Sequence, residues 1–341
     1  MRVLVLCLMM ASSALAQRQS GSPLDHLPAN IQLLTHFGER ADFSPDNKRV
    51  AFMDKSFGDA FVLDLDTRQI RCLTCNVPAA AFLRVMHLSN GDYILIGPEK
   101  FTDIHTSRTR DNELWYLSKK AGSKPIRLGE RMSEGAAISK KDLKIAVAET
   151  PGQDPKMASG SSRIITADVD LSGSSPRLVN RKVVYESNTT ACTVEPQDFY
   201  ESGSKLTFTC YNRKDIPSDA DLYSNVMSLD LESGKVTNMT QHDGTYNEVE
   251  GIFPDGKYTC VEGDRQVAEL GGRHGDHNID IWKLRLDGTG KDFSRLTHFN
   301  DYDGWKASNP VISTDGKYMA FQVASTKDEA GVGYGILLYQ F

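Results

Sequence analysis

The sequence predicts an all-β fold, a six-bladed β-propeller closed by an N-terminal strand that joins the C-terminal blade. Three observations lead to this prediction. Six strand–turn–strand segments recur at intervals of roughly 50 residues, further strand-like segments follow each of them, and a segment near the N-terminus repeats the end of the fifth unit. Length alone would not decide the matter, because 341 residues allow one large domain or two ordinary ones.

The hairpins are the clearest part of the repeat. Each is a short strand, a tight polar turn and a second strand. The three strongest copies are ADFSPDNKRVAF from Ala41, GIFPDGKYTC from Gly251 and PVISTDGKYMAF from Pro310. Weaker copies are MHLSNGDYILI from Met86, AAISKKDLKIAVA from Ala136 and DFYESGSKLTF from Asp198. Six such units match the spacing of propeller blades.

The outer strands explain how the ring closes. Blade one continues as AFVLDLDTRQIRCLT and blade five as DIWKLRLDGTGKDFSRLTHF, whereas the chain ends after GYGILLYQF, one strand short of a full sixth blade. The segment IQLLTHF at residues 31–37 closely repeats SRLTHF at residues 294–299. We therefore expect residues 31–37 to supply the missing outermost strand, which removes the exposed sheet edges.

The first 17 residues have the features of a cleavable signal peptide. Arg2 is followed by an apolar stretch and by Ala14-Leu15-Ala16. The apolar run is too short to cross a bilayer of roughly 30 Å, and no later stretch resembles a membrane span. We expect residues 1–17 to direct the chain to the secretory pathway and the extracellular space, and residues 18–341 to form a single propeller domain.

Charge and acceptor motifs narrow the choice of partners. The net charge of −6 argues against nucleic acid, which needs a concentrated basic face. Asn188 and Asn238 head Asn-x-Thr triplets, which are glycosylation acceptors in a eukaryotic secretory pathway. We expect small-molecule substrates, and the sequence leaves the oligomeric state open.

Five cysteines remain after the signal peptide, so at least one is a free thiol or pairs outside the chain. Cys192 and Cys210 would lie on neighbouring antiparallel strands and are the preferred disulfide. Cys72 and Cys75 form a Cys-x-x-Cys pair without a second such pair. This favours a local disulfide or two plain thiols over a redox or zinc site.

The long loops indicate which face of the propeller carries the functional site. If strands A to D of a blade are numbered outward from the axis, all the A–B turns are tight, whereas the B–C connections are long. These connections are residues 99–112, 149–162, 212–221 and 262–278. Because function concentrates in loops on a rigid scaffold, we place the site on their rim. The alternative is that the long loops have no role in function.

An alignment of the hairpins on their turns places six further residues at this rim. The residue before each turn is large and apolar, and the position four residues upstream starts strand A. These upstream residues are Glu39, Arg84, Glu134, Glu195, Glu248 and Ser308. Five of them are ionisable, and charges held close together shift one another's pKa values. A set of mutually paired polar groups without a catalytic role is the alternative.

Further candidates lie in loops on the same side. Arg273, His274, Asp276 and His277 belong to one glycine-rich loop, where the histidines would act as acid and base, ligate a metal, or only shape the loop. No third spaced ligand accompanies them, so we predict no metal. Candidate substrate contacts are His105, Tyr246, Tyr302 and Trp305, the last two as an aromatic wall. Since no phosphate loop or dinucleotide motif is present, we predict no cofactor.

The turn sequences SPDNK at residues 44–48, PDGK at 254–257 and TDGK at 314–317 resemble those of TolB-like and WD40-like (PD40) propellers, over nearly the whole mature chain. The segments HNIDIWKLRLDGTG, RLGERMSEGAAIS and GVGYGILLYQF resemble secreted fungal TolB-like proteins, a group that includes the hetero-Diels–Alderases of tropolone meroterpenoid biosynthesis. This resemblance implies [4+2] addition of a tropolone-derived ortho-quinone methide to a humulene-type sesquiterpene, giving a dihydropyran.

For that chemistry we expect Arg84, Arg273 or His274 to polarise the substrate oxygen. We expect Glu248 or His277 to accept and donate protons. Because propellers host unrelated functions, two alternatives remain. One is an oligogalacturonate-type polysaccharide lyase, in which arginines and histidines act on a uronate. The other is a noncatalytic TolB-like binding scaffold.

Overall fold

The computed structural model of the protein describes residues 17–212, 221–241, 244–328 and 331–341. The expected signal peptide lies outside the described residues except for Gln17, and so does most of the predicted B–C loop of blade four. Within the described ranges, no helix has the length and apolar character needed to cross a membrane.

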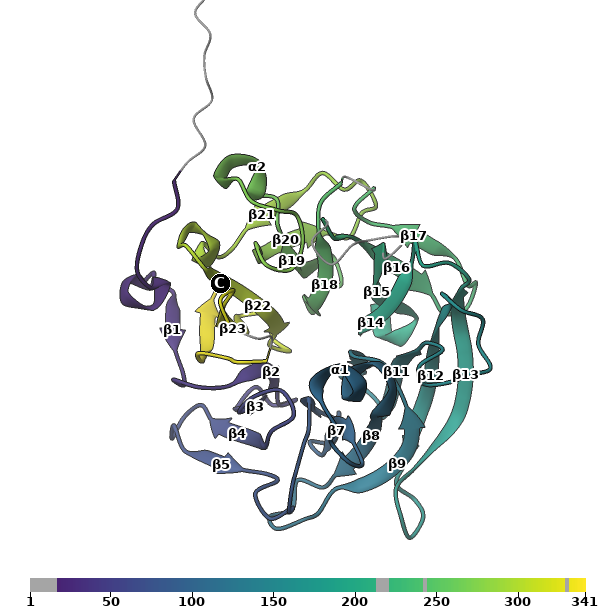
Figure 1. The fold of residues 1–341 in the computed structure, drawn as a ribbon. Helices are drawn as coiled ribbons and strands as arrows, with labels where there is room; N and C mark the ends of the chain where they lie inside the picture. The colour runs from purple at the N-terminus through teal and green to yellow at the C-terminus, as the bar shows by residue number, and fades with distance from the viewer. Residues whose placement is uncertain (1–16, 213–220, 242–243, 329–330) are drawn as a thin grey trace, which may run out of the picture.

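Six four-stranded antiparallel sheets surround a central axis, so the fold is a six-bladed β-propeller (Figure 1). In blades one to five the strands follow one another in the chain from the axis outward. Blade one contains β2 (Glu39–Phe43), β3 (Arg49–Met53), β4 (Ala60–Asp64) and β5 (Ile70–Cys72). Blade two contains β6 (Arg84–His87), β7 (Tyr93–Pro98), β8 (Asn112–Leu117) and β9 (Ile126–Arg131). Blade three contains β10 (Ala136–Ile138), β11 (Lys144–Glu149), β12 (Ser162–Asp170) and β13 (Arg177–Ser187).

The remaining blades continue the same order around the ring. Blade four contains β14 (Thr193–Tyr200), β15 (Lys205–Asn212), β16 (Tyr223–Asp230) and β17 (Val236–Asn238). Blade five contains β18 (Asn247–Ile252), β19 (Tyr258–Gly263), β20 (Asp280–Arg285) and β21 (Phe293–Arg295). Blade six contains β22 (Trp305–Ile312), β23 (Tyr318–Ser325) and β24 (Ile336–Gln340), with β1 (Ile31–Leu33) outermost. Short helical segments occupy connections: η1 (Pro23–His26), α1 (Ile104–Thr106), η2 (Ser107–Asp111), η3 (Glu201–Gly203), α2 (Val267–Leu270) and η4 (Phe299–Asp301).

The two ends of the chain meet in blade six. β1 pairs antiparallel with β24, Ile31 lies opposite Tyr339, and the amide of Leu34 donates to the carbonyl of Ile336 at 2.8 Å. Figure 1 shows the purple N-terminal strand beside the yellow C-terminal blade. This is the strand pairing expected from the repeated Leu-Thr-His-Phe sequence.

A threonine hydroxyl gives that repeat its physical basis. At the end of the outermost strand, Thr35 Oγ1 accepts a hydrogen bond from the amide of Ile336 at 3.0 Å, on the next strand inward. Thr297 accepts in the same way from Ile281 at 2.9 Å, and Thr74 from Ala60 at 2.9 Å. Each bond satisfies a buried amide that the short outer strand leaves unpaired. The terminal strand therefore carries the same signature as the complete blades.

The tight A–B turns are held by aspartates. Asp46 Oδ1 accepts from the hydroxyl of Ser44 at 2.6 Å and from the amide of Lys48 at 3.2 Å. Asp315 makes the equivalent bonds to Ser313 and Lys317 in blade six. Side-chain bonds of this kind favour turns over continued strand, which explains why the Ser-x-Asp and Pro-Asp-Gly-Lys sequences mark the hairpins.

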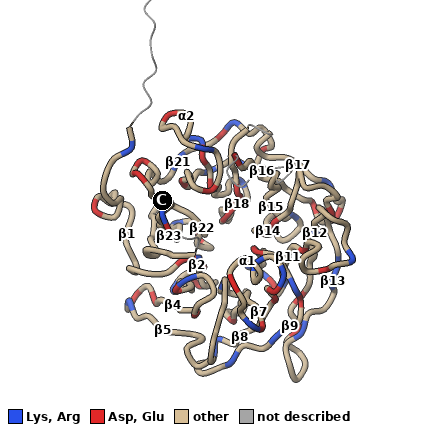
Figure 2. The backbone as a smooth tube through the Cα atoms, in the orientation of Figure 1, with Lys and Arg blue, Asp and Glu red and all other residues tan. Residues whose placement is uncertain are grey.

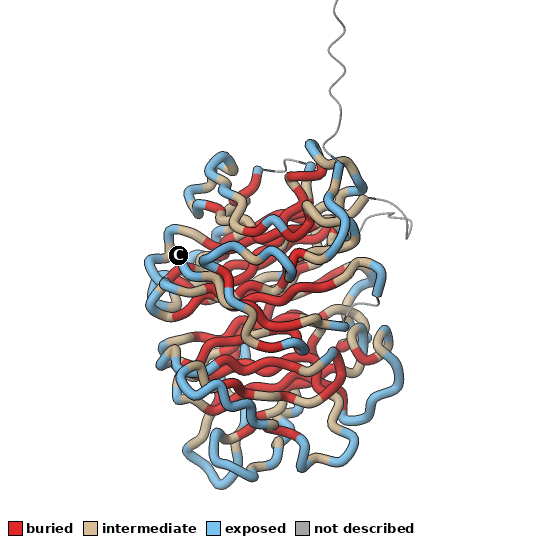
Figure 3. The backbone as a smooth tube through the Cα atoms, turned by 90° about the vertical axis from the view of Figure 1, so that its left-hand side faces the viewer, coloured by how far each residue is buried: buried red, intermediate tan, exposed pale blue. Residues whose placement is uncertain are grey.

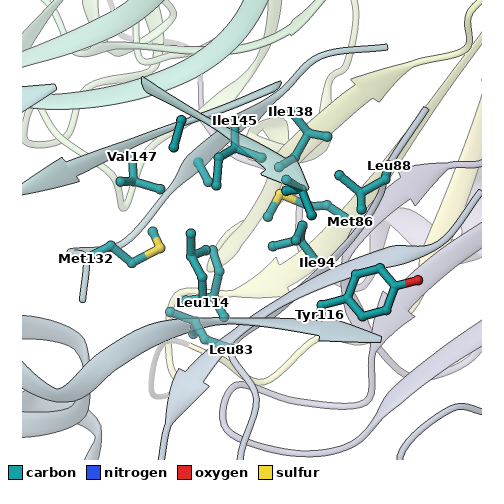
Figure 4. Packing of buried hydrophobic residues seen from close by; sticks show 14 of the residues in the cluster. Leu83, Met86, Leu88, Ile94, Leu114, Tyr116, Met132, Ile138, Ile145 and Val147 are labelled. Atoms are coloured by element: carbon teal, nitrogen blue, oxygen red, sulfur yellow. The ribbon is translucent and has the colours of Figure 1, made fainter. Parts of the chain in front are cut away.

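The hydrophobic core lies between neighbouring blades rather than in one central cluster. Between blades two and three, Leu83, Ile94 and Leu114 pack against Ile145 and Val147 (Figure 4). Seen from the side, buried strands run through the middle of the molecule and exposed loops lie at its periphery (Figure 3). Because each sheet is buried on both faces, the inner strands are fixed well enough to hold polar side chains along the axis.

Two disulfides are present among the described cysteines. Cys192 bonds to Cys210, as expected from the sequence, and ties the start of blade four to β15. Cys72 bonds to Cys75 within a sequence separation of 3. Cys260 is the remaining described cysteine; it is buried and free.

Removing the longer disulfide should cost more stability than removing the shorter one. The Cys192→Ser, Cys210→Ser double variant opens a loop with a sequence separation of 18, so we expect its free energy of unfolding to fall by about 3 kcal/mol in urea titrations. The matched control, Cys72→Ser with Cys75→Ser, should lose roughly half as much, because the loop is shorter. Equal losses would contradict this account.

Candidate functional site

A cavity of about 270 Å³ lies at the loop-rich mouth of the central channel, and we call it the ring cavity. Its lining includes all six residues that the hairpin alignment places at the inner ends of the blades: Glu39, Arg84, Glu134, Glu195, Glu248 and Ser308. They converge because strand A of every blade starts at this mouth; β2 begins at Glu39 and β6 at Arg84. Figure 2 shows acidic and basic residues gathered around the central opening.

Arg40 adds a cation that the hairpin alignment does not predict. The pairing of β2 with β3 is irregular between Glu39 and Asp42, and Arg40 adopts a left-handed φ of 55°. Its amide donates to Gln322 Oε1 at 2.6 Å, which fixes the irregularity. Because a bulge changes the facing of successive residues, both Glu39 and Arg40 line the ring cavity.

Neighbouring arginines hold Glu134 in its ionised form. Its Oε1 lies 2.6 Å from Arg40 Nη2 and 2.8 Å from Arg108 Nη2, the latter on η2 of the blade-two loop. Burial opposes ionisation of this carboxyl, but the positive charges of Arg40, Arg108 and Arg84 outweigh it and lower the pKa to about 2. At neutral pH Glu134 therefore carries a negative charge shared between two guanidinium groups.

Glu195, the next ring position, is in the opposite state. Burial, followed by the negative charges of Glu248 and Glu134, raises its pKa to about 8. Tyr211 donates a long hydrogen bond to its Oε2, at 3.4 Å. At neutral pH the carboxyl of Glu195 holds a proton that it can give to a bound molecule.

Gly135 makes room for Glu195. A Cβ atom at Gly135 would lie 2.1 Å from Glu195 Oε1, so any side chain there would displace the carboxyl. Gly135→Ala should therefore destabilise the fold by more than the roughly 1 kcal/mol expected for a left-handed backbone alone. Gly129→Ala is the matched control, since φ is similar (78° against 82°) and nothing lies within 4 Å. Urea unfolding of both variants tests this, and equal losses would show that Glu195 is not confined by Gly135.

Glu248 and Glu262 face each other across strands β18 and β19. The hydroxyl of Tyr246 donates a hydrogen bond to Glu248 Oε2. Burial and then the charge of Glu248 raise the pKa of Glu262 to about 8, although the amide of Asn309 donates to its Oε1 at 2.5 Å. The hairpin alignment covers only the first strand of each blade and therefore does not place Glu262 at the ring; its position opposite Glu248 on the neighbouring strand was the available signal.

Arg84 is the least satisfied cation of the cavity. It is 9% exposed, and its Nε makes no hydrogen bond to any described residue. Among the described residues no carboxylate lies within ion-pair distance of its guanidinium, in contrast to Arg40 and Arg108. A buried donor without a partner is costly, so the free Nε of Arg84 could donate to an oxygen of a ligand.

Of the candidate residues in the glycine-rich loop, some line the ring cavity and others lie outside it. His277 lines the ring cavity, is 57% exposed, and shares a 2.8 Å contact between its Nδ1 and Asp276 Oδ1. His274 does not line the cavity; its Nδ1 lies 2.9 Å from Asp264 Oδ2. Arg273 is exposed and also lies outside the lining.

Of the four other predicted contacts, only Tyr246 lines the ring cavity. His105 is exposed on α1. Tyr302 pairs with Gln19 in an isolated bridge, and Trp305 donates from Nε1 to the carbonyl of Gly21 at 3.0 Å. The segment before β1 thus covers this aromatic pair, which lies away from the lining of the cavity.

One group of side chains has the spacing of metal ligands. In the described part of the chain, ligand atoms of Asp59, Cys72 and Cys75 lie within 4.8 Å of one another. Both sulfur atoms belong to the Cys72–Cys75 disulfide, so they are not thiolates in this state. His274, Asp276 and His277 do not converge, because His274 pairs with Asp264 instead.

The arrangement is suited to proton transfer on an oxygenated small molecule. Glu134 and Glu195 are neighbouring carboxyls whose environments drive their pKa values to about 2 and about 8. Such a separation is typical of acid–base sites. Arg84 supplies a positive charge for an oxygen that gains electron density.

No family model matches the sequence, and no curated protein matches it. Solved structures do resemble it. A chain of hydrazine synthase from Kuenenia stuttgartiensis has a TM-score of 0.54 and 12% identity, over 88% of this chain and 82% of that one. TolB from Acinetobacter baumannii has a TM-score of 0.52 and 14% identity, over 90% and 65%. Regucalcin, a calcium-binding protein from Agrobacterium tumefaciens, has a TM-score of 0.51 and 10% identity, over 90% and 92%. At these identities the comparisons establish one point: the chain shares the β-propeller fold of TolB and other propellers.

Proposed function

We propose that the protein is a hetero-Diels–Alderase that joins a tropolone-derived ortho-quinone methide to a humulene-type sesquiterpene, forming a dihydropyran without a cofactor. The observation that carries the proposal is that one cavity holds both the guanidinium of Arg84, whose Nε has no described hydrogen-bond partner, and the proton-bearing carboxyl of Glu195. The resemblance of three segments to fungal TolB-like proteins supplies the substrate class.

The first step is loss of water from a hydroxylated tropolone precursor. Glu195 donates its proton to the departing hydroxyl as the carbon–oxygen bond breaks. Glu248, which accepts a hydrogen bond from Tyr246, takes the proton that the ring hydroxyl loses. The products are one water molecule and a neutral ortho-quinone methide, and no electrons are gained or lost.

The second step is the cycloaddition. Arg84 donates hydrogen bonds to the quinone methide oxygen, which makes the heterodiene more electrophilic. The alkene then adds across it, forming one carbon–carbon and one carbon–oxygen bond with every atom retained. Holding the two reactants together removes part of the entropic barrier, which is worth several kcal/mol in well-oriented reactions.

The lining of the ring cavity offers different surroundings to the two reactants. The walls of the ring cavity are mainly polar or charged, which favours the tropolone, whereas Leu222 and Val332 contribute apolar surface. Val332 is 46% exposed and free to cover a hydrocarbon. The polar ring would therefore occupy the cavity among the glutamates, and the sesquiterpene would lie at its mouth beside the exposed Val332, outside the enclosed volume.

The direct experiment incubates purified protein with the hydroxylated tropolone precursor and humulene and follows the dihydropyran product by chromatography. We expect faster formation and a single stereoisomer relative to buffer. An unchanged rate and isomer ratio would reject the proposed reaction. Binding of the precursor without turnover would instead support the scaffold function.

A polysaccharide lyase is the second candidate, because Arg40, Arg84 and Arg108 line one cavity and suit the carboxylates of a uronate. Release of unsaturated uronides from oligogalacturonate would favour it. For either activity we propose a secretory or extracellular location, which the predicted signal peptide and the two disulfides support.

A further inference from the structure

A second cavity, also of about 270 Å³, lies at the opposite mouth of the channel. It is enclosed by the A–B turns of blades one, three, four, five and six, and we call it the turn cavity. Its apolar walls are Phe199, Tyr200, Ile252, Phe253, Pro254 and Ile312. Nothing in the proposed reaction uses this space.

Two polar groups lie on the axial side of the turn cavity. Lys140 Nζ contacts Asp42 Oδ1 at 2.9 Å, and an ammonium group has three protons to donate. Asp198 Oδ2 accepts from the amide of Ile252 at 2.9 Å. Burial raises the pKa of Asp198 to about 7, against the opposing effects of Lys140 and this amide. Both Lys140 and Asp198 also line the narrow part of the channel.

The two mouths are separated by that narrow part. It holds a cavity of only about 60 Å³, bounded by Arg40 and Arg84 toward the ring cavity and by Lys140 and Asp198 toward the turn cavity. This volume is well below the roughly 150 Å³ that holds benzene, so the space admits a few waters but not an organic ligand of that size. A molecule in the turn cavity would therefore bind independently of one in the ring cavity.

We propose that the turn cavity is a second ligand site, for an uncharged, mainly apolar molecule of about ten heavy atoms that carries one hydrogen-bond-accepting oxygen, such as a cyclic ketone. The size follows because a cavity of about 150 Å³ holds benzene. The oxygen would accept from Lys140. An anionic ligand would meet the charge of Glu201, which also lines the turn cavity, and a cationic ligand that of Lys140, so neutrality is favoured.

Calorimetric titration with 1-indanone, and with indane as the hydrocarbon lacking the oxygen, tests this site. We expect the wild-type protein to bind 1-indanone at least tenfold more tightly than indane. Lys140→Met should remove that preference while leaving indane binding unchanged, and Lys140→Arg, which keeps a donor, should restore part of it. Ile252→Trp, which fills the cavity, should abolish binding of both compounds.

Arg84→Met separates this site from the proposed reaction, because it alters the ring cavity and should leave both affinities unchanged. Thermal unfolding of each variant shows whether the fold is retained. The proposal is overturned if the wild type binds neither compound, if Ile252→Trp binds both as the wild type does, or if folded Lys140→Met keeps the preference for the ketone.

Discussion

Arg84→Met should lower the turnover of the proposed cycloaddition by 10²- to 10³-fold, as expected for loss of one preorganised donor to a developing oxyanion. The side chain is buried and lacks a described partner for its Nε, so its removal breaks no ion pair in the described structure. The loss should fall on kcat rather than KM, because the donor stabilises charge that grows in the transition state. Single-turnover measurements of dihydropyran formation give this directly.

Arg131→Met is the matched control. Arg131 lies on β9 of the same blade, is exposed, and does not line the ring cavity. We expect its turnover to stay within twofold of the wild type. A fully active Arg84→Met protein, or equal losses in both variants, would remove Arg84 from the mechanism.

Glu195→Gln should reduce turnover by roughly 10²-fold or more, because the amide cannot donate a proton to the leaving hydroxyl. In the wild type the rate should fall as pH rises through about 8, where Glu195 loses its proton. In the variant that dependence should disappear. Rate profiles between pH 6 and pH 10 compare the two, and a wild-type rate that is constant across pH 8 would contradict the assignment.

The same residue should leave a mark on stability that does not depend on any reaction. Because the pKa of Glu195 is higher in the folded than in the unfolded chain, the folded state binds more protons between these two values. Stability therefore decreases as pH rises from about 4.5 to about 8, and the decrease is complete above that window. The free energy of unfolding of Glu195→Gln, taken relative to that of the wild type, should therefore be higher at pH 9 than at pH 5. Part of the decrease with pH should remain in the variant, because the pKa of Glu262 is also raised to about 8.

Much of the fold follows from local signals in the sequence. Aspartates mark the A–B turns because they bond the turn amides, and the Leu-Thr endings mark outer strands because the hydroxyl caps an amide of the neighbouring strand. Counting back four residues from each turn places Glu134, Glu195 and the other ring positions in the lining of one cavity, although strand A ranges from 3 residues in β10 to 8 in β14.

The remaining residues of the site could not be placed from the sequence, because no short motif indicates the features that position them. Arg40 enters the cavity through a bulge and a left-handed backbone, which no turn motif indicates. Trp305 and His274 lie on the expected rim, yet contacts with Gly21 and Asp264 draw them away from the cavity. Loop sequence indicates which rim a residue occupies but not the direction of its side chain.

The pairing of β1 with β24 also governs when the fold can be completed. The first strand of the chain must wait for the last one, so the final sheet keeps an open edge until β24 has been made and β1 has paired with it. Between the completion of β24 and its pairing with β1, the newly made chain presents β24 as a template for other extended segments. Loss of residues 31–35 would make the exposure permanent, and oligomers joined at this edge are the expected consequence.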